Sequence, residues 1–269
     1  MGPHERWTAL LDILGRDGRL DVAGAAAELS VSAATIRRDL DHLAGQQLLT
    51  RTRGGAAPAS VAYDLPLRYK SGRYTEQKAR IGAAAAALIP PGSVVALNGG
   101  TTTSQVARAL VTMPVPEPPA DAELDGPDDG IRYTVVTNAL NIANDLAVRR
   151  TVKLVVTGGV ARPSSYELIG PLAEPGLVRV HLDLAVLGVD GFDMAVGATA
   201  DHEGEAAVTA MMVARASRVV VVADSSKLGR ASFARVCTAD VVDVLVTDDG
   251  ADPALLGAAR EAGIEVVQA

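Results

Sequence analysis

The sequence predicts an α/β protein with a small, mostly helical N-terminal domain and a larger, doubly wound, mainly parallel α/β domain. Three observations support this fold class. Residues 6–46 carry three consecutive apolar stripes at helical spacing. Short valine-rich segments then recur between residues 94 and 246, separated by helical stretches. Aromatic residues make up only 3%, so the core must be built from Ala, Val, Leu and Ile, which suits helices packed on strands.

The composition excludes several classes of protein. Hydrophobic residues make up 48% and charged residues 21%, as in an ordinary globular protein. No apolar run approaches the ~20 residues that span a bilayer, and residues 1–6 do not begin a signal peptide. Cys237 is the single cysteine, and the four histidines are scattered. We therefore expect a cytoplasmic protein with no membrane partner, internal disulfide, metal or cofactor.

The N-terminal elements follow in a recognisable order. Residues 6–16 predict a first helix, and residues 20–29 a second, with Asp21 as its cap. Ser32 caps a third helix over residues 33–46, whose apolar stripe ends at Leu43. Residues 48–55 read as a strand that runs into a glycine turn. This order predicts a winged helix-turn-helix over residues 1–57.

The third helix is the candidate reader of double-stranded DNA. Its small and basic residues lie at the N-terminal end and on the outer face, where they can enter a major groove and grip guanine edges or phosphates. The alternation of threonine and arginine along the wing places two further arginines on one side. Solvated surface arginines are the alternative interpretation, but the ordered array favours DNA. The predicted DNA-binding residues are Ser32, Ala34, Thr35, Arg37, Arg38, Arg51 and Arg53.

The charge distribution agrees with this interpretation. Residues 1–70 hold nine Lys and Arg against eight Asp and Glu, so a net charge of −7 leaves −8 on the remainder. A neutral-to-basic N-terminal domain joined to an acidic larger domain is typical of a DNA-binding domain fused to a sensor domain. Residues 58–74 carry prolines and no clear period, which predicts a linker. Residues 114–129 are rich in proline and acid, which predicts a disordered surface loop.

The larger domain is expected over residues 75–269, beginning with an alanine-rich helix at 76–88. A strand at 94–97 leads into glycines, a threonine cluster and a helix start, an arrangement that binds anions. Because ligands of parallel sheets sit at the C-terminal strand ends, we expect a site where the polar clusters gather. Turn formation is the alternative role for these glycines and asparagines. Further strands are predicted at 134–136, 153–156, 184–187, 218–222 and 244–246.

Two sets of motifs resemble the DeoR family of regulators. Residues 29–40, with Thr-Ile-Arg-Arg-Asp-Leu, and the glycine-rich wing at 51–56 resemble its DNA-binding signature. The segments at 98–103, 136–141, 188–191 and 224–227 resemble its effector domain, which is related to ribose-5-phosphate isomerase and glucosamine-6-phosphate deaminase. The resemblance implies a repressor of a carbohydrate operon that binds a palindromic operator as a homodimer or homotetramer and is released by a phosphorylated sugar.

The resemblance also assigns roles within the effector site. The threonine loop would hold the phosphate. Asn138, Asp190 and Glu205 would face sugar hydroxyls, and Lys227 would pair with the phosphate or an anomeric oxygen. The full set of predicted effector-binding residues is Asn98, Gly99, Gly100, Thr101, Thr102, Thr103, Thr137, Asn138, Gly159, Arg162, Asp190, Glu205 and Lys227.

Two departures from the family pattern bear on the effector. Position 98 is Asn where the family usually has Asp, and Thr209 begins a stretch that has lost two cations. Two alternatives stay open at this point. The chain could be an active sugar-phosphate isomerase or deaminase with a DNA-binding head, using Asp190, Glu205 and Lys227 for proton transfer. It could also be a DNA-binding protein whose pocket has lost its ligand.

Overall fold

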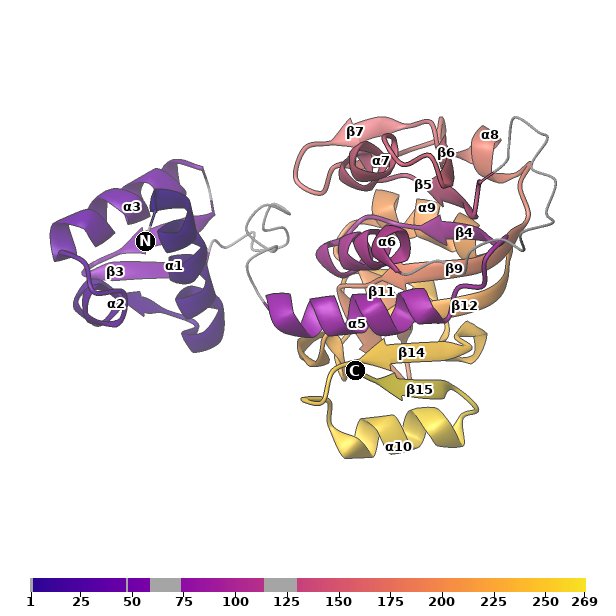
Figure 1. The fold of residues 1–269 in the computed structure, drawn as a ribbon. Coiled ribbons are helices and arrows are strands. Elements are labelled where there is room, and N and C mark those ends of the chain that lie inside the picture. The colour runs from indigo at the N-terminus through magenta and orange to yellow at the C-terminus, as the bar shows by residue number, and fades with distance from the viewer. Residues whose placement is uncertain (1, 47, 59–73, 114–129) are drawn as a thin grey trace. The chain divides into compact units, whose positions relative to one another are not determined.

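The computed structural model describes residues 2–46, 48–58, 74–113 and 130–269. The chain divides into two compact units, Met1–Thr75 and Glu76–Ala269 (Figure 1). Most of the predicted linker, and the whole of the expected loop at 114–129, lie outside the described residues. No described helix has the length and apolar character needed to cross a membrane.

The first unit contains the three predicted helices, with one change at the start of the second. These are α1 (Pro3–Asp17), α2 (Val22–Glu28) and α3 (Ala33–Gly45). Leu20 and Asp21, predicted as helical, form the short strand β1 because they pair with a later strand. Asp21 nevertheless caps α2 as expected, since its carboxylate accepts a hydrogen bond from the backbone N–H of Gly24 at 2.8 Å.

The wing is an antiparallel sheet in the order β1-β3-β2, with β2 at Leu49–Thr52 and β3 at Gly55–Pro58. Gly55 makes this sheet feasible, because a Cβ at that position would lie 1.7 Å from the carbonyl oxygen of Leu20. The apolar stripes of the helices meet in one core, in which Ile36 and Leu40 are fully buried. The winged helix-turn-helix predicted from the sequence is thus confirmed.

The second unit is built on a seven-stranded sheet in which every neighbouring pair is parallel. Its spatial order is β15-β14-β12-β9-β4-β5-β6. The sequence predicted all of these strands except the last along the chain, β15. Their bounds are β4 Val94–Leu97, β5 Tyr133–Thr137, β6 Val152–Val156, β9 Leu182–Gly188, β12 Ala216–Val222, β14 Val244–Thr247 and β15 Glu265–Gln268.

Helices cover both faces of this sheet (Figure 1). Successive residues of a strand pack in two separate cores, one on each face of the sheet. Val95 and Leu97 lie in one core, and Ala96 lies in the other. The first core contains α5 (Thr75–Ala87), α6 (Thr101–Thr112) and α7 (Leu140–Leu146). The second contains residues of α8 (Glu174–Leu177), α9 (Glu203–Val213) and α10 (Pro253–Glu261). The doubly wound architecture is therefore as predicted.

Two small antiparallel elements were not predicted. One is the hairpin of β7 (Val160–Arg162) and β8 (Glu167–Ile169), which follows β6. The other is a sheet of β10 (Gly191–Asp193), β11 (Gly197–Ala200) and β13 (Ala234–Cys237). Short 3₁₀ turns, η1 (Ser225–Lys227) and η2 (Ala239–Val241), follow β12 and β13. The hairpin, β10 and η1 all begin where parallel strands end, so they add side chains to the C-terminal edge of the main sheet.

Candidate functional site

The start of α3 is fixed by two hydroxyls. Ser32 accepts a hydrogen bond from the backbone N–H of Thr35 at 3.1 Å, and the two side-chain oxygens lie 2.9 Å apart. Ser32 is thus the predicted N-cap. Both hydroxyls therefore already bond within the helix end, which holds the first turn of α3 in place.

The outer face of α3 carries the predicted basic residues. Ala34, Arg37 and Arg38 are exposed, whereas Ile36 and Leu40 are fully buried. This division follows from the helical period, because residues one or two positions from a buried stripe turn toward solvent. The exposed arginines lie within the first two turns, close to the positive end of the helix dipole.

A buried carboxylate on α3, which the sequence analysis did not single out, ties this helix to α1. Asp39 is only 5% exposed. It accepts hydrogen bonds from the guanidinium of Arg6 and, at 2.8 Å, from the indole N–H of Trp7. The Asp39 hydrogen bond raises the pKa of Arg6 above its usual value. Trp7 also stacks on His42 with ring centroids 4.0 Å apart. These contacts set the orientation of α3 relative to α1.

The two wing arginines differ in their surroundings. Arg51 donates to the carbonyl oxygen of Gly55 at 2.7 Å and forms an ion pair with Asp41 at 2.9 Å. Arg53 is exposed in the turn between β2 and β3. Arg53 is therefore the more accessible cation of the wing, and Arg51 braces the wing against α3.

The threonine cluster lies within α6 rather than in a loop before it. Thr101–Thr103 form the first turn of the helix, and Gly100 precedes it with φ 137°. The hydroxyls of Thr103 and Ser104 donate to the Gly100 carbonyl oxygen at 3.1 and 2.7 Å. What this turn presents to an anion is therefore its backbone N–H groups, which have no partner within the helix.

Asn98 serves the sheet rather than facing open space. Its amide exchanges two hydrogen bonds with the backbone of Gly188, at 2.9 and 2.8 Å, and so joins the ends of β4 and β9. The same side-chain nitrogen lies 3.4 Å from the hydroxyl of Thr209. The two departures from the family pattern are therefore in contact with each other. Both of these side chains are buried.

Glu167 lies at the centre of the strand ends and was missed by the sequence analysis. It is 4% exposed and accepts a hydrogen bond from the Asn138 side chain at 2.8 Å. Burial, followed by the nearby charge of Glu205, raises its pKa to about 8, although the Asn138 hydrogen bond acts in the opposite direction. The side chain lies against Gly99, where a Cβ would be 2.3 Å from the Glu167 Cγ.

Two ion pairs surround this buried acid. Arg162 lies 3.2 Å from Glu205, and Lys227 lies 3.4 Å from Asp190. Both carboxylates act on Glu167 electrostatically, so the structure brings these predicted residues into one cluster. In the first pair, the side chain of Glu205 is 11% exposed and that of Arg162 is 19% exposed. In the second pair, the side chain of Asp190 is 18% exposed and that of Lys227 is 26% exposed. Each cation is thus more exposed than the carboxylate with which it pairs.

The remaining predicted residues have structural contacts. Thr137 is fully buried, and its hydroxyl accepts from the backbone N–H of Ala139 at 3.1 Å. Gly159 lies in the connection to β7, against the backbone of β8. Asn138 is fully buried, and its side-chain oxygen has no hydrogen-bond partner among the described residues. A buried amide oxygen without a donor calls for a water or a ligand group.

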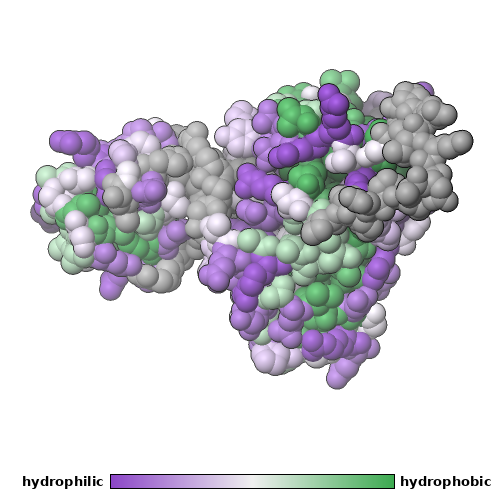
Figure 2. All heavy atoms as spheres, in the orientation of Figure 1, coloured by the Kyte–Doolittle hydropathy of each residue, from purple (hydrophilic) through white to green (hydrophobic). Residues whose placement is uncertain are grey.

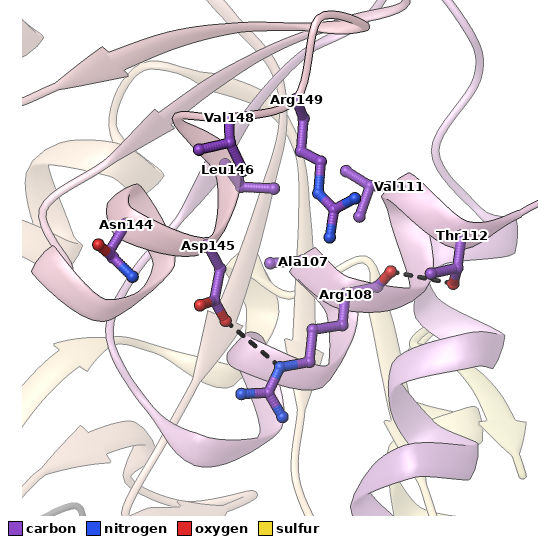
Figure 3. Close-up of a pocket in the computed structure, with 9 residues that line it drawn as sticks. All are labelled: Ala107, Arg108, Val111, Thr112, Asn144, Asp145, Leu146, Val148 and Arg149. Carbon is purple, nitrogen blue, oxygen red and sulfur yellow. Dashed lines mark hydrogen bonds and ion pairs between the residues drawn. The ribbon is translucent and has the colours of Figure 1, made fainter.

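A separate hollow of about 570 Å³ lies between the last turns of α6 and α7 (Figure 3). Arg108 and Asp145 point toward each other across it, 3.3 Å apart. Helices that connect parallel strands run antiparallel to them, so this hollow lies at the opposite end of the sheet from the first turn of α6. Among the described residues, no group of three or more His, Cys, Asp or Glu side chains is placed so that it could hold a metal ion.

Comparisons with known proteins match this two-part construction. Residues 6–61 match the model of the DeoR-like helix-turn-helix domain, and residues 125–249 match the DeoR C terminal sensor domain. A putative aga operon transcriptional repressor of Escherichia coli O157:H7 is 32% identical over 99% of this chain and 94% of its own length. The glycerol-3-phosphate regulon repressor of Escherichia coli K12 is 30% identical, over 92% of each chain.

The solved structures similar to this chain include ribose 5-phosphate isomerase A from Methanocaldococcus jannaschii. It is 17% identical and aligns with a TM-score of 0.39 over 57% of this chain and 54% of that chain.

Proposed function

Because the chain belongs to the DeoR family of transcription regulators, we propose that it represses a carbohydrate-metabolism operon and is released from its operator by a phosphorylated sugar. The observation that carries this proposal is the presence, in one chain, of two different surfaces. One is the exposed basic face of α3. The other is the cluster of acids and cations at the strand ends.

For DNA binding, α3 enters the major groove with Ala34, Arg37 and Arg38 toward the base edges and phosphates. Small residues let the helix approach closely, and arginine can bind guanine with two hydrogen bonds. The Ser32–Thr35 pair presents the helix N-terminus to a phosphate. Arg53 contacts the backbone beside the groove, while Arg51 holds the wing in position.

For effector binding, the phosphate lies at the first turn of α6, on the N–H groups that Gly100 and Thr101–Thr103 leave free for an anion. Lys227 and Arg162 add positive charge at the mouth of the same site. The hydroxyls of the sugar would then bond to Asn138, Asp190 and Glu205. A polyhydroxylated anion fits such a site because each carboxylate is an acceptor that an O–H can reach.

For regulation, effector binding changes the arrangement of DNA-binding domains in a homodimer or homotetramer. A palindromic operator requires two domains at a fixed spacing, so a ligand that favours another arrangement lowers operator affinity. The protein would act in the cytoplasm with its operator. The enzymatic alternative is not retained, since the relatives are named as regulators.

The test is fluorescence anisotropy with DNA from upstream of the chain's own gene, at fixed salt because phosphate contacts make affinity salt-dependent. We expect tight binding that weakens by about tenfold or more in Arg37→Ala or Arg38→Ala, which corresponds to the ~1–3 kcal/mol of a good arginine–base contact. Arg149→Ala, an exposed arginine on the second unit, is the matched control. Absence of sequence-selective binding at moderate salt contradicts the proposal.

A further inference from the structure

We propose that Glu167 determines which ligand the sensor site accepts: its carboxyl donates a hydrogen bond to a ligand oxygen close to the phosphate. This inference rests on the proposed function and deepens it, because it assigns a chemical role to a residue outside the predicted set. It also gives the site a dependence on pH that a site of fixed charges does not have.

The position of Glu167 supports this role. Its side chain lies against Gly99, two positions before the first residue of α6. The N–H groups that receive the phosphate therefore begin beside the carboxyl group. Only glycine at 99 leaves room for this approach, since a Cβ would lie 2.4 Å from the nearer carboxyl oxygen. Any other residue at position 99 would clash with the Glu167 side chain, so the glycine is required by the packing of Glu167 as well as by the approach of a ligand.

The charges around Glu167 favour its neutral form. Glu205 on α9 and Asp190 after β9 face it as like charges, and the nearby cations, Arg162 on β7 and Lys227 on η1, are already paired with them. With Glu167 protonated, these five side chains sum to zero. With Glu167 ionised, the cluster carries −1 and repels a phosphate at α6. A pKa of about 8 keeps the carboxyl protonated at pH 7, so it can donate.

Asn138 completes a donor and acceptor pair. Its side-chain nitrogen donates to Glu167, and weakly to the backbone of Leu168 at 3.3 Å, which fixes the orientation of the amide. Its oxygen, fully buried, has no partner among the described residues. A sugar hydroxyl can donate to that oxygen and accept from the Glu167 O–H. The pair therefore selects a phosphate ester with a hydroxyl or carbonyl oxygen near the phosphate over inorganic phosphate.

The experiment is isothermal titration of the full chain with ribose 5-phosphate, fructose 6-phosphate and glycerol 3-phosphate between pH 7 and 9. Phosphate monoesters have a second pKa near ~6, so their charge is constant across this range. For any ester that binds, we expect wild-type affinity to fall about fivefold between pH 8 and pH 9, because the protonated fraction of Glu167 falls by that factor. Glu167→Gln keeps an N–H donor, so it should bind within a few-fold of wild type at pH 7 and show no such fall.

The matched control is Glu203→Gln, which removes one charge from the exposed first turn of α9. It should keep the wild-type pH profile. A second measurement needs no variant: titration at pH 8 in two buffers of different ionisation enthalpy should show uptake of about half a proton per ligand, since Glu167 is then half ionised.

The outcomes separate the two proposals. If no ester binds the wild type, the sugar-phosphate function fails, and this inference fails with it. If an ester binds but Glu167→Gln retains the wild-type pH dependence, or no proton is taken up, the inference alone is overturned. Affinity for inorganic phosphate equal to that for the best ester also contradicts it.

Discussion

At the scale of single residues, the two positions at which the sequence departs from the expected family pattern contact each other. Asn98 uses both ends of its amide on Gly188 and also reaches Thr209. An aspartate at 98 could accept from the Gly188 N–H but could not donate to its carbonyl oxygen. A neutral pair at these two positions therefore preserves the junction of β4 and β9 without a buried charge.

The contact between Asn98 and Thr209 predicts that substitutions at these two positions have coupled effects on the free energy of unfolding. Asn98→Asp should lower the free energy of unfolding by about 1–3 kcal/mol, because it removes a buried donor and adds a charge. Thr209→Lys should destabilise by a similar amount, since that position is 1% exposed. The double variant should recover part of the loss, with a coupling of about 0.5–3 kcal/mol in urea unfolding. Strict additivity would show that the two side chains do not interact.

Glu167 predicts a pH dependence of stability. Because its pKa is about 8 in the folded chain against its usual 4.5, the folded state binds more protons between these values. The free energy of unfolding should therefore fall as pH rises from 4.5 to 8, by up to ~1.4 kcal/mol per pH unit, and level off above. Glu167→Gln should remove this slope from the urea unfolding of the second unit. An unchanged slope would assign it to other groups.

At the scale of elements, the orientation of α3 depends on α1. Asp39 is the buried partner of both Arg6 and Trp7, so its loss removes the acceptor that these two donors share. The exposed arginines of α3 would keep their charge and lose their fixed direction. On the proposed function, operator binding would therefore depend on Asp39, although its side chain is buried.

Asp39→Ala should destabilise the N-terminal unit by about 1–3 kcal/mol, because it removes a buried acceptor, and weaken operator binding. Ligand binding by the second unit should not change. Glu28→Ala is the control, because it removes an exposed carboxylate from α2 and leaves α3 and the wing unchanged. Thermal unfolding and anisotropy measure both effects. Full operator affinity in Asp39→Ala would exclude the orienting role.

Sequence patterns predicted long elements well and short ones poorly. Long elements repeat their apolar pattern over several residues, so the period can be recognised in the sequence. Examples are the helical stripe that contains Ile36 and Leu40 and the valine runs of the main sheet. Leu20 and Asp21 were placed in a helix because nothing local reveals their pairing with Ala56 and Gly55. The three-residue strand β8 is too short to show a period, and Glu167 was missed with it.

The candidate site was predictable to a similar extent. The topology of parallel sheets predicts where it lies, and the structure places Asp190, Glu205, Arg162 and Lys227 in one cluster there. The sequence did not predict which of these residues make structural contacts within the second unit. Asn98 bonds to the backbone of Gly188, which lies on another strand far along the chain, so no local pattern reveals this contact.

At the scale of the whole molecule, the proposed regulation requires the two units to influence each other through an oligomer. Figure 2 shows apolar side chains interrupting the polar surface of the second unit on the face in view. Its large exposed apolar residues include Val160 at 64% and Leu172 at 66%. Residues of this kind can take part in association, and an operator of two half-sites supplies the functional reason for it.

In the proposed repression, operator and phosphorylated sugar bind one protein with opposing preference. Thermodynamic linkage requires that each ligand lower the affinity of the other by the same factor, of about 5–150-fold for a typical regulator. We would measure operator affinity with and without saturating sugar phosphate, and sugar-phosphate affinity with and without saturating operator, on the full chain at one salt concentration. Equal factors above about fivefold are the predicted result. Binding of both ligands with no mutual effect would contradict the account.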